Sequence, residues 1–378
     1  MKRIICIITL FLSFLVAARS SDPKDDLSKA ENLMLLDPAA SCKIAEKIYK
    51  NKDLNHKQKL LCLFILTNTS NILQKPLDVI KYGNEALENA DNSGDKIIKI
   101  KILGIVGNTY QSLQLNEKTR VYLDQAESLL SSAKASDSLN LVKGNIYYLK
   151  GMNYFYSLDS DIALSYFNKA INQYLLSKNS LAEINIKLAY LNKAYALIQQ
   201  KQLHQAAENL KLASVNIYET SRPYPPQFAE LQEIFIELGK AKILSLQKKP
   251  DLSNEILFRI LNLRKNQPAR DDIENEIYQL LADNYLQKSD IKQYNYYNTM
   301  YNNRVKESNR EAAKLVNQLI LEEDKRNDSE KESIGKKYAI WILVTSVFFS
   351  GLIIFLLIET IRKEQKRKLL KNEAFKNI

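Results

Sequence analysis

The amino-acid sequence predicts an all-α protein: an α-solenoid of about six or seven helical hairpins, followed by a long helix that leads into one transmembrane helix. Three observations predict this fold. Only 9 Gly and 8 Pro occur in 378 residues, which favours helices joined by short turns. Small and large apolar residues recur at helical spacing, and the pattern repeats along the chain. Near the C-terminus, one uncharged segment is long enough to cross a bilayer.

The clearest hairpin lies at Tyr147–Leu175. Residues three and four apart share one face of a helix, so each of its two helices has a packing face. These faces carry Tyr147, Gly151 and Tyr154 in the first helix, and Ala163, Phe167 and Ala170 in the second. Small residues stand where two helices must approach closely, and large ones fill the gaps beside them. A polar turn at 158–161 joins the helices, and Asp161 is expected to cap the second one.

The same pattern recurs on both sides of this hairpin, at an offset of 44 residues upstream and 43 downstream. The upstream matches are Leu103, Gly107 and Tyr110, then Thr119, Leu123 and Ala126. The downstream matches are Tyr190, Ala194 and Leu197, then Ala206, Leu210 and Ala213. Weaker copies follow at 228–265 and from Asp271, and a shortened hairpin at Leu27–Lys50 is broken by Asp37-Pro38. We expect the solenoid to occupy residues 21–300.

This order of small and large residues resembles the tetratricopeptide repeat, a helix-turn-helix unit of about 34 residues. The longer spacing here implies helices longer by a turn or more. Lys150 departs from the family, which usually has a large apolar residue there. The resemblance implies that the first helices line a concave groove for a protein or peptide. The candidate groove residues are Asn108, Gln111, Tyr148, Met152, Phe155 and Tyr195. Alternatively, Met152 and Phe155 belong to the core.

The first twenty residues are predicted to be a secretory signal peptide. A basic start is followed by an apolar run of 13 residues, Ile4–Val16, which is short for a membrane span. Ala18 and Ser20 supply the small residues that a cleavage site needs. A buried N-terminal helix is the alternative.

Near the C-terminus, residues 301–337 are predicted to form a charged helix and Tyr338–Ile358 a transmembrane helix of 21 uncharged residues. The apolar stripe of the charged helix is expected to pack on the repeats, with a homodimeric coiled coil as the alternative. The tail at 359–378 is basic. Its first basic residues are Arg362, Lys363, Lys366, Arg367 and Lys368. By the positive-inside rule, the tail is cytoplasmic and the repeats are periplasmic, with the span in a bacterial inner membrane.

Charge and residue types give no sign of catalysis. The formal net charge is +11, and it falls to +8 without the three basic residues of the signal peptide. The tail accounts for +4 of the remainder, so no direct contact with nucleic acid is expected. Only His56 and His204 are present, and phosphate-loop, zinc-protease and serine-hydrolase motifs are absent. We therefore expect no enzymatic activity, no cofactor and no metal site. Cys42 and Cys62 could be paired or free.

The order of signal peptide, repeats, charged helix, single span and basic helix resembles a group of bacterial membrane-bound regulators. Leu281–Glu307 looks like the last repeat of that group. Its members continue into a helix-turn-helix or kinase domain, and we expect neither before Ile378. Two hypotheses follow. One is a membrane-anchored scaffold or adaptor that binds a protein or peptide. The other is the sensor part of a regulator or receptor, which acts through a cytoplasmic signalling partner.

Overall fold

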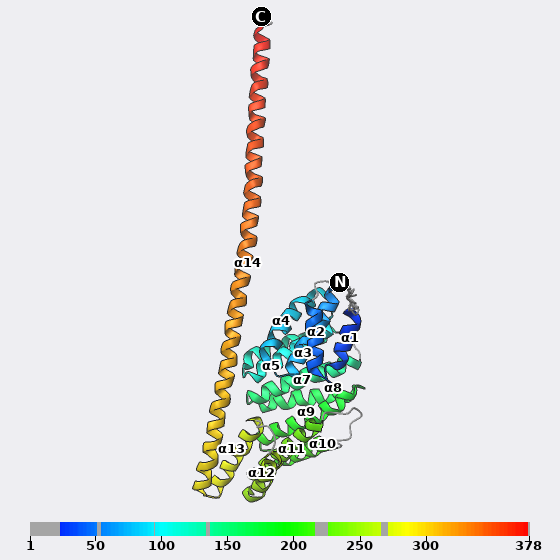
Figure 1. The fold of residues 1–378 in the computed structure, drawn as a ribbon, viewed down its shortest axis with the longest axis vertical. Helices are drawn as coiled ribbons and strands as arrows, with labels where there is room; N and C mark the ends of the chain where they lie inside the picture. Colours follow the sequence, from blue (N-terminus) through cyan, green and yellow to red (C-terminus); the bar gives the residue numbers. More distant parts are fainter. Residues whose placement is uncertain are drawn as a thin grey trace, which may run out of the picture. The chain divides into compact units, whose positions relative to one another are not determined.

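The computed structural model describes residues 23–50, 54–93, 95–133, 137–215, 226–265 and 271–376. These residues form fourteen helices and no strand, which confirms the predicted all-α solenoid (Figure 1). The helices are α1 (Pro23–Leu33), α2 (Pro38–Tyr49), α3 (His56–Ile72), α4 (Pro76–Ser93), α5 (Lys96–Ser112), α6 (Asn116–Ser131), α7 (Asp137–Tyr156), α8 (Ser160–Leu175), α9 (Ser180–Gln199), α10 (Leu203–Ser214), α11 (Pro226–Leu246), α12 (Pro250–Arg264), α13 (Asp271–Gln287) and α14 (Ile291–Lys376). The predicted signal peptide lies outside the described residues.

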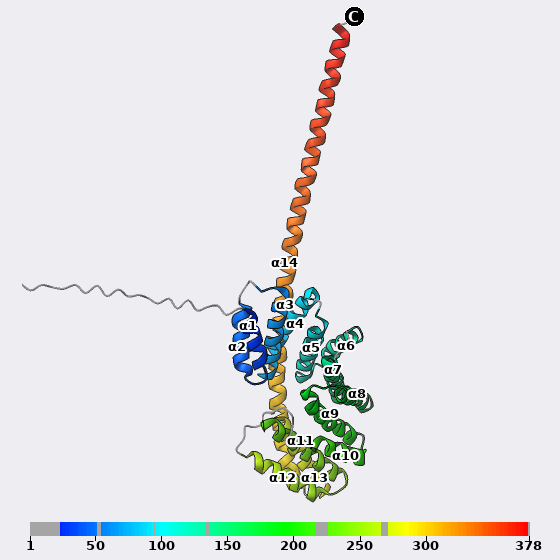
Figure 2. The same ribbon diagram turned by 90° about the vertical axis from the view of Figure 1, so that its right-hand side faces the viewer.

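The helices pair in sequence into seven hairpins, from α1/α2 to α13/α14, in agreement with the predicted number. Successive first helices contact one another from α3 to α13. Among the described residues, successive second helices such as α6 and α8 make no comparable contact. The row of first helices is therefore the tighter, concave side of the stack, and the second helices lie on its outside (Figure 2).

Six consecutive hairpins turn in the same way, with one residue in the left-handed backbone region. These residues have φ between 56° and 61°, and they are Gln74, Gln114, Leu158, Lys201, Lys248 and Ser289. In the central hairpin, the Leu158 amide donates to the Phe155 carbonyl (3.1 Å) and the Asp159 amide to the Tyr154 carbonyl (2.9 Å). This pair of bonds ends a helix in a Schellman motif. The cap of α8 is Asp159, which accepts from the Ile162 amide at 3.2 Å, so the expectation for Asp161 was wrong.

The core of the central hairpin depends on a close approach of α7 and α8. The Phe167 side chain is fully buried and packs with Ala163 and Ala196. It lies directly against Gly151, where an added Cβ would sit 2.7 Å from two atoms of the ring. Any larger residue at position 151 therefore displaces the ring or separates the helices.

Lys150, the position that departs from the repeat pattern, is a buried cation with its own partners. Its side chain is 5% exposed, and its Nζ lies 2.7 Å from Asp124 and also pairs with Glu127, both on α6. The ammonium group lies 4.8 Å from the centre of the Tyr166 ring. Burial alone lowers the pKa of Lys150, but the hydrogen bonds to the two carboxylates outweigh it and raise the pKa. The lysine thus joins α7 to α6 by ion pairs and contacts α8 through the Tyr166 ring.

The two cysteines of the repeats are buried free thiols. The Cys62 thiol donates to the Ala45 carbonyl at 3.2 Å. Burial raises the pKa of Cys62 to about 12, and it also raises the pKa of Cys42. Both side chains therefore stay protonated at neutral pH and act as core residues.

The chain divides into two compact units, Met1–Ala312 and Ala313–Ile378, and each is described by itself. The second unit is a continuous part of α14. By length and composition, one helix of the described chain can cross a membrane, over Ile291–Ile353, and its most apolar stretch has no buried residue. Arg362 and Lys363 are exposed on the same helix, and residues 366–368 follow within it.

Candidate binding surface

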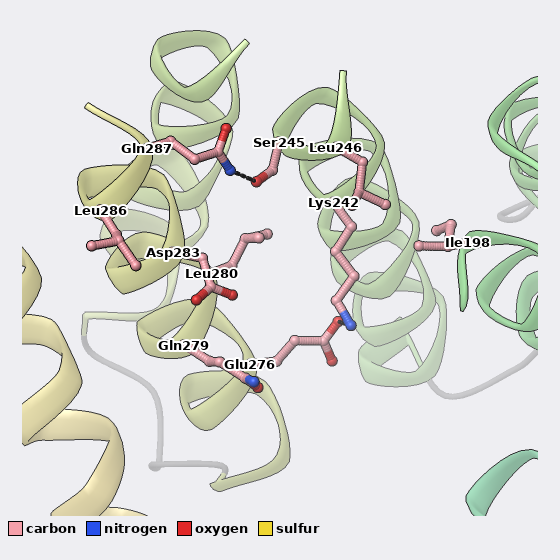
Figure 3. A pocket seen from close by; sticks show the side chains of 10 residues that line it. All are labelled: Ile198, Lys242, Ser245, Leu246, Glu276, Gln279, Leu280, Asp283, Leu286 and Gln287. Carbon is pink, nitrogen blue, oxygen red and sulfur yellow. Dashed lines mark hydrogen bonds and ion pairs between the residues drawn. The ribbon is translucent and has the colours of Figure 1, made fainter. Parts of the chain in front are cut away.

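The first helices of the hairpins form a surface that carries two hollows, one at the C-terminal end of the row and one at its centre. The larger hollow, named here the C-terminal pocket, lies between α9, α11 and α13 and has a volume of about 520 Å³. Its lining residues are Ile198, Lys242, Ser245, Leu246, Glu276, Gln279, Leu280, Asp283, Leu286 and Gln287 (Figure 3). Three successive first helices thus contribute to one site.

Two polar links join α11 to α13 across the C-terminal pocket. Lys242 Nζ lies 2.7 Å from Glu276 Oε1, and the same ammonium lies 4.9 Å from the centre of the Tyr195 ring. Gln287 Nε2 donates to Ser245 Oγ at 3.1 Å. These links hold the two helices at a fixed spacing. Figure 3 shows the Asp283 carboxylate pointing into the space between α11 and α13.

Burial raises the pKa of two titratable groups in this region, Asp283 and Tyr195. Neighbouring protein atoms desolvate the Asp283 carboxyl and raise its pKa, although the residue keeps an exposed surface. Burial raises the pKa of Tyr195 well above its ordinary value, and the charge of Glu276 adds to this effect. The Tyr195 hydroxyl is therefore neutral, and it donates to the Phe235 carbonyl at 2.8 Å. The arrangement offers apolar contact, amides and charge for binding.

The second hollow, named the central pocket, has a volume of about 260 Å³ and lies at α7, α8 and α9. It is lined by Asn145, Tyr148, Leu149, Tyr174, Asn185 and Leu188. Asn145 Oδ1 accepts from the Tyr174 hydroxyl at 3.0 Å and from Asn185 Nδ2 at 2.9 Å. Asn192 Nδ2 donates to the Tyr148 hydroxyl at 2.9 Å. Amides and tyrosines of neighbouring hairpins are thus already ordered around this hollow.

The candidate groove residues lie in different surroundings. Tyr148 lines the central pocket, and the Tyr195 ring lies under Lys242 beside the C-terminal pocket. Met152 and Phe155 are half-buried and pack, as Tyr148 does, against a core cluster formed by Ala163 and Phe167 of α8 and Ala196 of α9.

Two further candidates, Asn108 and Gln111, are half-buried on α5. The Gln111 side-chain amide is occupied by Asn116, at 2.9 Å, and by Asn153, at 2.8 Å. Of the six candidates, Tyr148 alone lines one of these two pockets.

The residues expected to pack between helices fall into a buried and a half-buried group. Buried members are Gly107, Tyr110, Ala126, Gly151, Ala163, Phe167, Ala170, Ala194, Ala206, Leu210 and Ala213. Half-buried members are Tyr147, Tyr154 and Tyr190. The tyrosines border the buried layer, and Tyr154 stacks on Tyr166 with 5.6 Å between ring centres.

The sequence did not point to the C-terminal pocket. Its residues on α13 recur every three or four positions, from Glu276 through Leu280 and Asp283 to Gln287. That spacing was a signal, but a polar stripe on an amphipathic helix is also what a solvated face looks like. The described part of the chain contains no group of His, Cys, Asp and Glu side chains that could hold a metal ion.

Comparison with known proteins gives a likeness of fold. No protein-family model matches the chain, and no curated protein sequence matches it. The apo form of RapI has 13% identity and a TM-score of 0.51, over 80% of this chain and 90% of that one. A Rap protein complexed with competence and sporulation factor has 12% identity and a TM-score of 0.51, over 76% and 98%. The apo quorum sensor NprR from B. thuringiensis has 14% identity over 75% and 87%, with a TM-score of 0.44.

At these identities, the two Rap structures show the fold alone. The chain is an all-helical solenoid of tetratricopeptide-like repeats. The stack of hairpins defines it as a helical-repeat protein, and the row of first helices carries both pockets.

Proposed function

We propose that the chain is a membrane-anchored binding protein that holds a protein or peptide ligand on its first helices, outside the cytoplasm. The observation that carries the proposal is the C-terminal pocket, which three successive first helices build from apolar, amide and charged side chains. Pockets with this mixture are typical of binding sites. The likeness to a Rap protein complexed with competence and sporulation factor supports it, since a solenoid of similar fold holds a partner.

An extended polypeptide suits this surface better than a compact small molecule does. α9 contributes Asn185 and Leu188 to the central pocket and Ile198 to the C-terminal pocket, so the two hollows follow one another along the row. An extended chain can place separate side chains in separate hollows, and its backbone can bond to the ordered amides.

A pocket-filling variant tests the binding site. Gln279 is exposed on α13 and lines the C-terminal pocket, so Gln279→Trp is expected to fill it and weaken peptide binding at least tenfold, by roughly 1.4 kcal/mol or more. The matched control is Gln205→Trp on α10, a second helix, where the residue is also exposed. The probes are fluorescent heptapeptide pools with arginine, citrulline or glutamate fixed at the centre and alanine, leucine and asparagine mixed around it. Fluorescence anisotropy of the full chain in detergent gives the affinities. The proposed site would be contradicted if both variants lost the same affinity for the peptides, or if neither variant lost any.

Membrane anchoring and orientation form the second part of the proposal. The support is an apolar stretch of α14 that is long enough to span and has no buried residue, followed by basic residues. Single cysteines at Ser329 and Asn372, with Cys6, Cys42 and Cys62 changed to serine, report the topology. In intact cells, an impermeant maleimide is expected to label position 329 and to label position 372 only after lysis. The reverse labelling pattern would show the opposite orientation and contradict the proposal.

A specific contact favours the alternative function, the sensor part of a signalling protein. α13 presents one face to the C-terminal pocket and another to the start of α14. Tyr285 stacks on Tyr297 of α14 with 5.6 Å between ring centres, and Glu274 pairs with Arg304 of α14 at 2.5 Å. A ligand that moves α13 would therefore also move the beginning of α14.

Deletion of the C-terminal tail distinguishes the two proposed functions. A sensor that acts through a cytoplasmic partner loses its output when Glu359–Ile378 is deleted, while the purified chain still binds the peptide pools. A protein that only binds keeps its cellular phenotype after the deletion.

A further inference from the structure

The C-terminal pocket contains one carboxylate for which the protein supplies no partner. Lys242 is neutralised by Glu276, and Gln287 is bonded to Ser245. Among the residues that the structure describes, Asp283 makes no hydrogen bond or ion pair, and burial is the one influence on its pKa. The charged residues of the pocket therefore leave one net negative charge, and it lies between the two links that join α11 to α13.

A carboxylate in this position favours a cationic partner. Surrounding atoms have removed part of its hydration, so a positive group that reaches it recovers interaction energy that water no longer supplies. A charge-assisted hydrogen bond is about twice as strong as a neutral one. The pocket also has apolar walls at Leu280 and Leu286, which suit the aliphatic stem of a long basic side chain.

We infer, building on the proposed binding function, that the C-terminal pocket selects a polypeptide that places an arginine or lysine side chain against Asp283. The cationic head pairs with the Asp283 carboxylate, and the stem lies on the leucines. The Lys242–Glu276 pair forms the end of the pocket and stays intact. Asp283 is thus the residue that determines specificity for charge, and the ligand is a basic segment of extended chain.

Substitution of Asp283 in the full chain tests this inference with the same peptide pools. Arginine and citrulline have nearly the same shape but differ in charge, so wild type is expected to bind the arginine pool about tenfold more tightly than the citrulline pool. Asp283→Asn is expected to remove this preference. Asp283→Lys is expected to reverse it, so that the glutamate pool binds best. The matched control is Glu255→Gln, which removes one exposed negative charge from α12 and is expected to keep the preference.

The outcomes separate the inference from the proposed function. If wild type binds all pools with equal affinity and Gln279→Trp still lowers that affinity, the binding site stands and the inference about charge is overturned. An arginine preference that survives Asp283→Asn overturns it as well. If no pool binds wild type, both the proposed peptide function and the inference fail. Circular dichroism of each variant checks that loss of preference is not loss of fold.

Discussion

Replacement of Phe167 by alanine is expected to lower the free energy of unfolding by about 3–5 kcal/mol, as large-to-small changes of buried aromatic residues do. The ring is fully buried in the central hairpin, between Gly151 of α7 and Ala196 of α9. It also lies 6.1 Å, centre to centre, from the Tyr148 ring at the central pocket. Its loss opens a cavity at the junction of two hairpins. Urea unfolding of the full chain in detergent, followed by circular dichroism, measures the change.

A second substitution tests the cause of this effect. In the wild-type background, Gly151→Ala should destabilise the chain by about 1–3 kcal/mol, because the new Cβ meets the Phe167 ring at 2.7 Å. In the Phe167→Ala background the ring is absent, so the same change should be neutral or should stabilise α7 by up to about 1 kcal/mol through helix propensity. The same cost in both backgrounds would show that the close approach of α7 and α8 does not set the packing.

Replacement of Lys150 by methionine is expected to cost about 2 kcal/mol, because removal of one member of a buried ion pair leaves its partners uncompensated. The cost stays below the largest known for such changes, since Asp124 and Glu127 keep 53% and 30% of their side-chain surface exposed. Urea unfolding of the full chain measures it. Combining Lys150→Met with Asp124→Asn and Glu127→Gln should recover most of the loss.

Lys193 provides a matched control for Lys150, since it lies 43 residues further on at the equivalent position of the next hairpin. Burial lowers the pKa of Lys193, and among the described residues no carboxylate is paired with it. Its partly buried charge therefore has a cost without a compensating partner. Lys193→Met should be neutral or stabilising by up to about 1 kcal/mol. If the two lysine variants lose the same stability, then the carboxylates of α6 do not account for the role of Lys150.

The hairpins could be predicted because close helix packing requires small and large residues at fixed helical spacing. Leu103, Gly107 and Tyr110 repeat Tyr147, Gly151 and Tyr154, and the structure puts both sets on first helices. The turns were less predictable. In six hairpins the left-handed residue is not glycine, the residue that usually marks such a turn, and backbone bonds to the preceding helix hold it in that conformation.

The binding surface was harder to predict than the repeats, for two physical reasons. Neighbouring positions on a helix differ by about 100° in direction, so a small change of helix rotation decides that Tyr148 lines a pocket while Met152 and Phe155, packed against the same core cluster, do not. The C-terminal pocket combines side chains of three helices, and the repeat pattern is less regular over α11 and α13 than in the central hairpins. Lys150 was visibly out of pattern, but its partners lie 23 and 26 residues upstream on another helix.

The measurement that tests the central claim most directly is hydrogen–deuterium exchange of the full chain, with and without the arginine-centred peptide that binds most tightly. A ligand on the row of first helices should slow amide exchange in α9, α11 and α13, which line the C-terminal pocket. Exchange in the second helices α6 and α10 should stay unchanged. Protection confined to second helices, or no protection with saturating peptide, would contradict binding on this surface.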